Sequence, residues 1–200
     1  LDYVINTVLA PKEYFKHHRH DFNLKEGTLI ALTSSIFYGL FNAARSLIST
    51  NFGDITVEMT VTEILSSTGW NILDGSFSLL VAATTTFLIV HLLALALGHA
   101  GWRKTFAAIS YATPIALLTG LVMVGYQLLE TFVVGFPLIN YLGLGAAMIY
   151  TSYVQARGLE TFHDMSFRKA FLLALTPAVL SIVLFIAAMY LYISMLASIV

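Results

Sequence analysis

Five long apolar stretches, nearly free of charged residues, are the feature that most constrains the fold of this chain. A segment of about 18 or more apolar residues is long enough to cross the roughly 30 Å hydrocarbon core of a bilayer as a helix. Backbone groups in lipid need hydrogen-bond partners within the protein, and alternating strands of about ten residues are absent, so the segments should be helices. We predict an all-α polytopic membrane bundle with five spans at about residues 28–48, 75–97, 105–129, 133–154 and 170–198.

The composition agrees with a membrane protein and excludes several other classes. Hydrophobic residues make up 58% of the chain and charged residues 10%, against roughly 25% charged in soluble domains. The net charge of −1 gives no basic excess for a nucleic-acid partner. The absence of cysteine removes disulfides, thiol nucleophiles and thiolate metal sites. We expect residues 1–200 to form one transmembrane domain, with residues 1–27 as a cytoplasmic lead.

The basic residues predict the orientation of the chain in the membrane. Nine of the ten lie before the first span or between the second and third or the fourth and fifth spans: Lys12, Lys16, Arg19, Lys25, Arg103, Lys104, Arg157, Arg168 and Lys169. Cytoplasmic loops are enriched in Lys and Arg, so the N-terminus should be cytoplasmic and the C-terminus on the far side. The exception is Arg45, which lies about one turn from the outer end of its helix and can extend its side chain outward.

Two segments outside the spans are expected to lie on the membrane surface. Residues 57–73 predict an interfacial helix in the first outer loop, with Trp70 at the headgroup level and an apolar face formed by Val57, Val61, Ile64, Leu65 and Ile72. The apolar residues before Pro11 predict a short interfacial helix and then a break. The polar run from Glu13 to Glu26 should then lead into the first span.

Histidines are the candidate chemical residues. His17, His18 and His20 could bind a metal, but Arg19 lies among them and successive helical side chains point about 100° apart. We therefore favour a surface segment attracted to anionic headgroups and predict no metal site and no cofactor.

A histidine within the second span is a candidate intramembrane polar site. An ionisable residue in a span is by default a functional hypothesis, but the neutral side chain of His91 can equally hydrogen-bond a neighbouring helix. No Asp, Glu or Lys lies deep in any predicted span to form a proton pathway with it, so we favour packing. We expect Glu130 to be a solvated turn residue between the third and fourth spans.

Small residues recur every four positions in the third span and again in the fourth. Such stripes let another helix approach closely, which drives helix association in lipid. The predicted helix-packing residues are Ala108, Ala112, Ala116, Gly120, Gly143 and Ala147. Pro114 lies beside the first stripe and removes a backbone hydrogen bond, so a kink is expected there.

Enzyme signatures are missing from the sequence. There is no glycine-rich phosphate loop, HExxH or GxSxG motif, and Ser34 and Ser35 have no neighbouring base. We predict no catalytic residues and a chain that is not an enzyme. An enzymatic reading would need His91, His99 or His163 together with a ligand that the sequence does not reveal.

Three stretches carry a family resemblance: Leu93–Gly120 (LALALGHAGWRKTFAAISYATPIALLTG), Gly158–Pro177 (GLETFHDMSFRKAFLLALTP) and, more weakly, Ala10–Phe15 (APKEYF). The matching positions are Gly98, Gly101, Phe106, Tyr111, Pro114, Gly158, Ala170 and Pro177. These stretches resemble the Ypt-interacting protein (Yip) domain family of five-span membrane proteins. The DLxGP-like motif of eukaryotic members is not present as such, which puts small-GTPase binding in doubt. The chain looks more like the compact prokaryotic relatives. The resemblance implies the cell membrane in a prokaryote or early secretory membranes in a eukaryote.

We therefore expect a non-enzymatic membrane scaffold or accessory subunit of a larger assembly. Its partners would be membrane lipids and other membrane-protein subunits or a second copy of the chain. The alternative is a small transporter or channel with a pathway near His91 and the proline-bearing helices, since broken helices often border binding sites. Five spans, however, do not divide into two equal repeats.

Overall fold

The computed structural model describes residues 2–19, 22–52, 60–132 and 137–197, and helices make up nearly all of them. No strand occurs within these ranges, so the predicted all-α class is confirmed there. The helices are α1 (Asp2–Leu9), α2 (Pro11–His18), α3 (Leu24–Phe52), α4 (Val61–Ala96), α5 (Trp102–Ser110), α6 (Ile115–Phe132), α7 (Pro137–His163) and α8 (Phe167–Ala197).

Four helical segments among the described residues are long and apolar enough to cross a membrane. They are Leu24–Ser49, Val61–Ala96, Trp102–Glu130 and Phe167–Met195. They correspond to the predicted first, second, third and fifth spans. The predicted fourth span, residues 133–154, falls largely in α7, and residues 133–136 lie outside the described part of the chain. A fifth span therefore stays a prediction.

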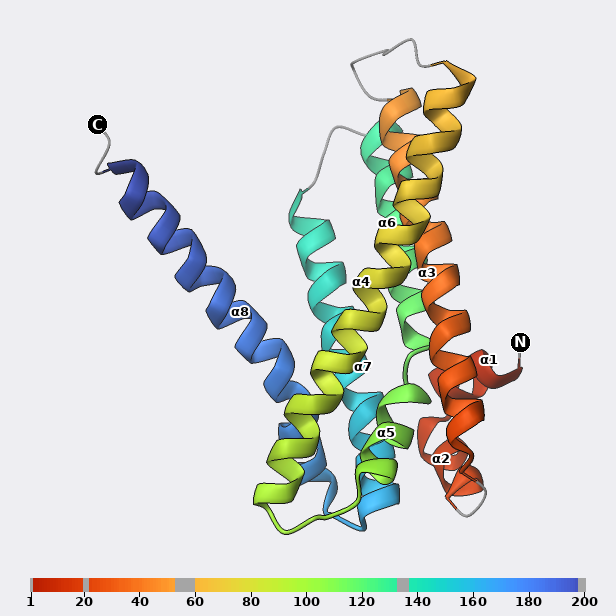
Figure 1. The fold of residues 1–200 in the computed structure, drawn as a ribbon, viewed down its shortest axis with the longest axis vertical. Coiled ribbons are helices and arrows are strands. Elements are labelled where there is room, and N and C mark those ends of the chain that lie inside the picture. The colour runs from red at the N-terminus through yellow and green to blue at the C-terminus, as the bar shows by residue number, and fades with distance from the viewer. Residues whose placement is uncertain (1, 20–21, 53–59, 133–136, 198–200) are drawn as a thin grey trace.

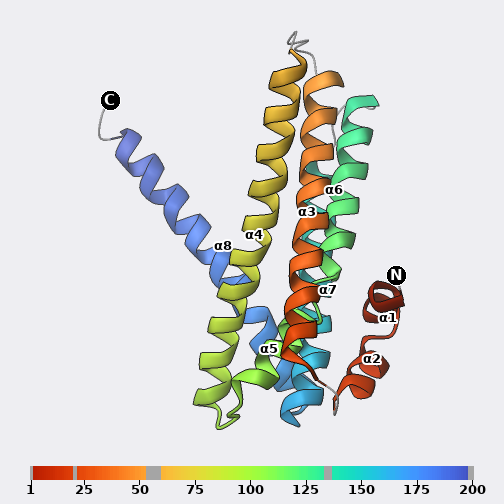
Figure 2. The same ribbon diagram turned by 45° about the vertical axis from the view of Figure 1, so that its right-hand side comes forward.

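The long helices form an elongated bundle from which one helix diverges (Figure 1). Figure 2 shows α3 between α4 and α6, and α3 packs on both of these helices. α1 and α2 lie beside the lower half of the bundle, where α2 packs on α7. α8 packs on α7 and on α4 at its beginning and then leaves the bundle, so its last turns lie far from α1.

Glycine allows the closest helix contact, which joins α3 to α4. A methyl group at Gly39 would lie 2.3 Å from the carbonyl oxygen of Ile72 and 2.4 Å from Oγ of Ser76. A methyl group at Gly75, on the opposing helix, would lie 2.9 Å from Cα of Gly39. These distances are shorter than van der Waals contact, so the two backbones can meet only because both residues lack a side chain.

The main buried core lies at one end of the bundle and includes the segment after Pro11. Phe15 of α2 is 0% exposed, and its ring meets Phe162 of α7 edge to face at 5.9 Å. Tyr111 is also fully buried and donates a hydrogen bond to Oε2 of Glu26 at 3.1 Å. The expectation of a polar lead after Pro11 was therefore incomplete. Tyr14 and Phe15 turn this stretch into a helix that is anchored in the core, with Pro11 at its first turn.

The structure corrects the prediction of an interfacial helix over residues 57–73. Residues 57–59 lie outside the described part, and residues 61–73 form the first turns of the continuous α4. The helix begins at Thr60, whose side chain accepts a hydrogen bond from the backbone N–H of Glu63 while the Glu63 carboxylate accepts one from the backbone N–H of Thr60. This capping box fixes the start. No proline interrupts the helix before Ala96, so it continues through Gly75 into the apolar span.

The third predicted span is broken rather than kinked. α5 ends at Ser110, residues 111–114 form turns, and α6 starts at Ile115. In this stretch the backbone N–H groups of Ala112, Thr113 and Ile115 bond to carbonyls three residues earlier. Pro114 has no N–H to continue the four-residue pattern. The predicted stripe of small residues is therefore divided between two helices.

We predict that Gly39→Ala destabilises the folded protein by about 1–3 kcal/mol, because the added methyl group must push α3 and α4 apart. The control is Gly69→Ala, at a position in α4 where an added methyl group has no neighbour within 4 Å. Alanine there should stabilise the helix by roughly 0.5–1 kcal/mol. Thermal unfolding in detergent measures both variants, and equal stability of the two would contradict the close contact.

Candidate functional site

A groove with a volume of about 540 Å³ opens on the side of the bundle. Residues from α4, the 111–114 turn, α6, α7 and α8 line it, together with Tyr38 of α3. Three of the predicted packing residues, Ala112, Ala116 and Ala147, lie in its wall, as does Pro177. These small side chains leave the space that defines the groove.

The groove presents an apolar surface although it contains several hydroxyl groups. No described lining residue is charged. Thr151 and Ser152 donate hydrogen bonds to carbonyls of their own helix at 2.8 and 3.0 Å, and Ser181 does so at 2.9 Å. Hydroxyls bonded in this way add little polarity toward the groove. The surface suits an apolar occupant better than a hydrated solute.

α8 borders the groove and separates from the rest of the bundle at a proline. Pro177 is buried and lies inside the helix, where it cannot donate to the carbonyl of Leu173. From Val179 to Met195 every residue is exposed on all sides of the helix. Figure 1 shows this part of α8 pointing away from α4 and α7. From Val179 to Ser194 the apolar surface of α8 is therefore not covered by the other described helices.

His91 does not stand alone as the sequence suggested. Its Nδ1 atom lies 3.3 Å from Oγ1 of Thr105, and the same hydroxyl lies 3.0 Å from Nε2 of His163. The ring of His99 is 6.3 Å from that of His163. The fold thus gathers the three histidines that the enzymatic reading named. These histidines are 8 and 64 positions apart along the chain, so no local motif predicted that they would meet.

The histidine cluster has the character of a structural hydrogen-bond link. Thr105 is 0% exposed and His163 is 6% exposed, so neither is open to a substrate. Burial lowers the pKa of His163 to about 4, and the nearby charges of Lys104, His99 and His91 act in the same direction. His163 is therefore neutral at physiological pH. The described residues contain no group of His, Asp and Glu arranged to hold a metal ion.

Six of the eight residues of the family resemblance lie in or against the buried core or line the groove, and the other two are turn glycines. Gly98 and Gly101 have φ values of +81° and +128° in the turn from α4 to α5, which only glycine adopts without strain. A methyl group at Gly158 of α7 would lie 2.9 Å from Cα of Ala108 in α5. The others lie as follows: Phe106 meets Phe87 edge to face, Tyr111, Pro114 and Ala170 are buried, and Pro177 lines the groove.

The other predicted packing residues contact different helices. A methyl group at Gly120 would lie 2.7 Å from the Phe41 ring of α3, and one at Gly143 would lie 3.4 Å from Val122 of α6. Ala108 faces α7, as described above. The stripe is therefore not a single docking face, because its members divide between two internal contacts and the groove.

A family model described as the Yip1 domain matches residues 5–189. The chain belongs to the Yip1 domain family. The match includes all eight residues of the resemblance, three of the four apolar helical segments in full and the fourth as far as residue 189. This Yip1 domain is therefore a multi-pass membrane protein. No curated protein and no solved structure shows a significant match to the chain.

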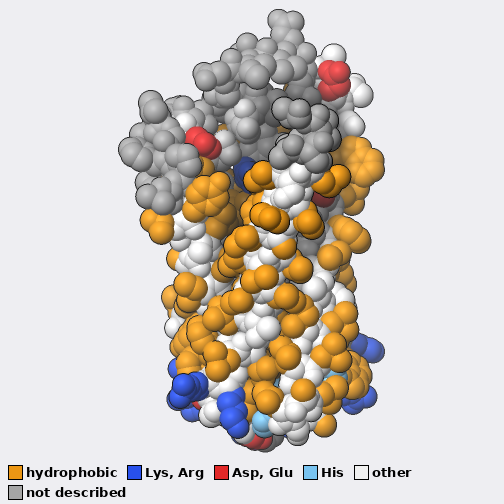
Figure 3. Space-filling model, turned by 90° about the vertical axis from the view of Figure 1, so that its left-hand side faces the viewer, with side chains coloured by type: hydrophobic (Ala, Val, Ile, Leu, Met, Phe, Trp, Pro, Cys, Tyr) orange, Lys and Arg blue, Asp and Glu red, His pale blue; other side chains and the backbone are white. Residues whose placement is uncertain are grey.

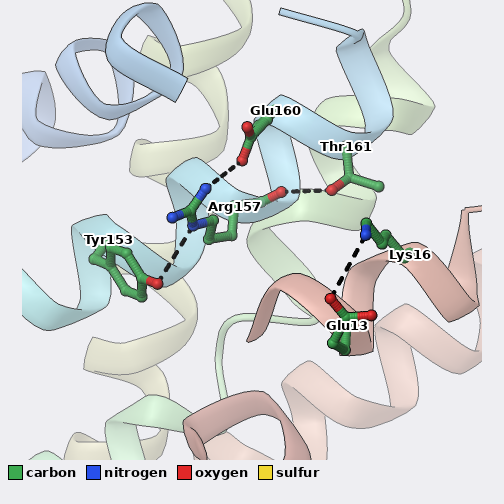
Figure 4. Close-up of polar contacts among 6 residues, drawn as sticks. All are labelled: Glu13, Lys16, Tyr153, Arg157, Glu160 and Thr161. Carbon is green, nitrogen blue, oxygen red and sulfur yellow. Dashed lines mark hydrogen bonds and ion pairs between the residues drawn. The ribbon is translucent and has the colours of Figure 1, made fainter. Parts of the chain in front are cut away.

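Sequence reasoning missed the polar contacts that hold the α7 end of this Yip1 domain. The guanidinium of Arg157 lies 4.0 Å above the Phe167 ring, and its Nη1 atom donates to Glu160 at 2.8 Å (Figure 4). Arg19 of the histidine run forms two hydrogen bonds to Asp164, at 2.6 and 2.7 Å. The His17–His20 segment was predicted to lie on the membrane surface, but its Arg19 also links the end of α2 to the α7–α8 turn. His20 lies outside the described residues.

We predict that stability falls between pH 6.5 and pH 4 because of His163. In the unfolded chain this histidine takes up a proton near pH 6.5, whereas in the folded chain it does so only near pH 4. As the pH falls, proton binding stabilises the unfolded state more than the folded state. The free energy of unfolding therefore falls by up to about 3 kcal/mol. His163→Gln should flatten this part of the curve, measured by thermal unfolding in detergent.

The exposed His17 of α2 supplies the matched control. His17→Gln should leave the pH dependence of the parent unchanged. An equal flattening by both substitutions would show that burial of His163 is not the cause.

Proposed function

We propose that this Yip1 domain is a non-enzymatic scaffold or accessory subunit that docks a transmembrane helix of a partner subunit in its lateral groove. The observation that carries the proposal is the groove, which is bordered by a helix whose apolar surface is exposed from Val179 to Ser194. A helix lying between α4 and α8 would cover both surfaces at once.

The lining of the groove favours a helix over a single lipid chain. Small residues on facing helices let backbones approach, and this is the main source of helix association in lipid. Ala82 and Ala83 of α4, Ala147 of α7 and Ala174 and Ala178 of α8 supply such surfaces on both sides. The hydroxyls of Thr85 and Thr86 can also accept or donate across a helix pair.

The proposal includes the predicted orientation with five spans. α7 contains 27 residues and so extends about 40 Å, which is enough to cross the hydrocarbon core. Lys and Arg side chains gather at the lower end of the face in Figure 3, below a broad hydrophobic band. That end would be cytoplasmic by the positive-inside rule.

The transporter alternative is supported less well. His91 does not line the groove, and its described contacts are with Thr105 and the Phe87 ring. Asn140 is another polar residue of the predicted fourth span, but the structure does not describe its side chain. An enzymatic role has less support than transport, because the Thr105 hydroxyl between two histidines is completely buried.

We predict that Ala147→Phe blocks the groove and lowers the yield of partner subunits that co-purify in mild detergent. A loss of about 1.4 kcal/mol in binding free energy would weaken the association roughly tenfold. The matched control is Ile149→Phe on the same helix, since Ile149 is exposed and does not line the groove. Light scattering after gel filtration measures the particle mass. A parent protein that runs as a stable monomer would contradict the proposal. So would equal association of both variants, which would leave lipid as the occupant.

The absence of cysteine allows a direct test of orientation. His17→Cys and Glu130→Cys each place a single thiol on an exposed residue, in α2 and near the end of α6. A membrane-impermeant maleimide should label Glu130→Cys in intact cells and His17→Cys only after permeabilisation. Labelling of both from the same side would rule out the predicted topology.

A further inference from the structure

A second, polar pocket lies between α3, α4 and α6, near the ends of these helices that are farthest from Lys25 and Arg103. Its volume is about 320 Å³, at the lower end of the range for small-molecule sites. Six of the residues that line it are Asn42, Arg45, Ser46, Asn71, Asp74 and Gln127. These side chains offer a polar ligand both charges and several hydrogen-bonding groups.

A network of amide hydrogen bonds between α3 and α4 forms the wall of this pocket. Nδ2 of Asn42 donates to the backbone carbonyl of Asn71 at 3.1 Å. Nδ2 of Asn71 donates in turn to Oγ of Ser46 at 3.0 Å and to the carbonyl of Ser67 at 2.8 Å. The wall lies about one helical turn beyond the close contact between Gly39 and Gly75, which fixes the spacing of the two helices. The pocket is therefore held in shape without a ligand.

The two charged residues of the pocket have opposite signs and do not pair. Arg45 comes from α3 and Asp74 from α4, and both side chains are exposed. Neither forms an ion pair within 4.0 Å with the other or with any other described residue. A positive and a negative group that line one pocket without touching are complementary to a ligand that carries both charges.

The pocket lies one bilayer thickness from the basic end of the molecule. Arg45 follows Lys25 by 20 positions in α3, which corresponds to about 30 Å along the helix axis. Asp74 precedes Ala96 by 22 positions in α4, or about 33 Å. The hydrocarbon core is also about 30 Å thick. With Lys25 and the end of α4 at one interface, both charges lie at the headgroup level of the other.

We propose that this pocket binds the phosphoethanolamine headgroup of a phospholipid, with the phosphate on Arg45 and the primary ammonium on Asp74. Arg donates in a fork that matches two phosphate oxygens, and a carboxylate accepts hydrogen bonds from an ammonium N–H. A choline headgroup has no N–H to donate, and its usual recognition uses aromatic rings. None of the described residues that line the pocket is aromatic.

The test is lipid binding to the full chain in detergent, followed by native mass spectrometry. Phosphatidylethanolamine, phosphatidylcholine and phosphatidylglycerol are the three probes. We expect phosphatidylethanolamine to bind about tenfold more tightly than phosphatidylcholine. Asp74→Asn should remove this preference, while Arg45→Gln should weaken phosphatidylethanolamine and phosphatidylglycerol alike by about tenfold.

Three controls make the outcome decisive. Arg103→Gln, at the basic end, should leave all three affinities unchanged. Thermal unfolding of each variant establishes that it is folded, and substitution of exposed charges leaves the Asn42–Asn71 wall intact. Ala147→Phe should also leave phosphatidylethanolamine binding unchanged, so failure of the groove proposal is distinguishable from failure of this one.

Two results would overturn the proposal. The first is equal affinity for phosphatidylethanolamine and phosphatidylcholine in the parent protein, or a preference that survives Asp74→Asn in a folded variant. The second is displacement of the lipid by glycerophosphoethanolamine at an equal concentration, which would assign the pocket to a soluble zwitterion. Failure of the soluble compound to compete supports the lipid.

Discussion

Close backbone contact is the interaction on which the rest of this bundle depends. Helices surrounded by lipid gain little hydrophobic energy by meeting, so they associate where their surfaces fit. Gly39 and Gly75 provide such a fit between α3 and α4, and Gly158 provides another between α7 and α5. These contacts fix the positions of the side chains that line both the apolar groove and the polar pocket. α8 contains no glycine, and it diverges from the bundle after Pro177 (Figure 1).

The sequence predicted what depends on the hydrophobic pattern and missed what depends on tertiary contact. Apolar length identified the helices around residues 28–48, 75–97 and 170–198, because lipid leaves the backbone few alternatives. The helix boundary near Gly75 was wrong, since the capping box at Thr60 starts a helix that nothing interrupts. The contribution of Phe15 to the core was missed because a single aromatic residue in a polar run carries no periodicity.

The candidate sites show the same division. The spacing of Ala108, Ala112, Ala116 and Gly120 indicated packing, but it could not reveal that the turn at residues 111–114 would divide them among separate surfaces. His91 was recognised as unusual, yet Thr105 and His163 became its neighbours only through the fold. Arg45 drew attention as an exception to the charge pattern. Its relation to Asp74 depends on the register of α3 against α4, which no local sequence signal specifies.

The divergence of α8 means that the molecule does not have the same cross-section at every depth. The helices gather around the core near Phe15 and Tyr111, while α8 separates from them toward its C-terminal end (Figure 1). In a bilayer, such a shape displaces more area in one leaflet than in the other. Unless another protein fills the space beside α8, lipid must enter it, and the two leaflets are then packed unequally around the protein.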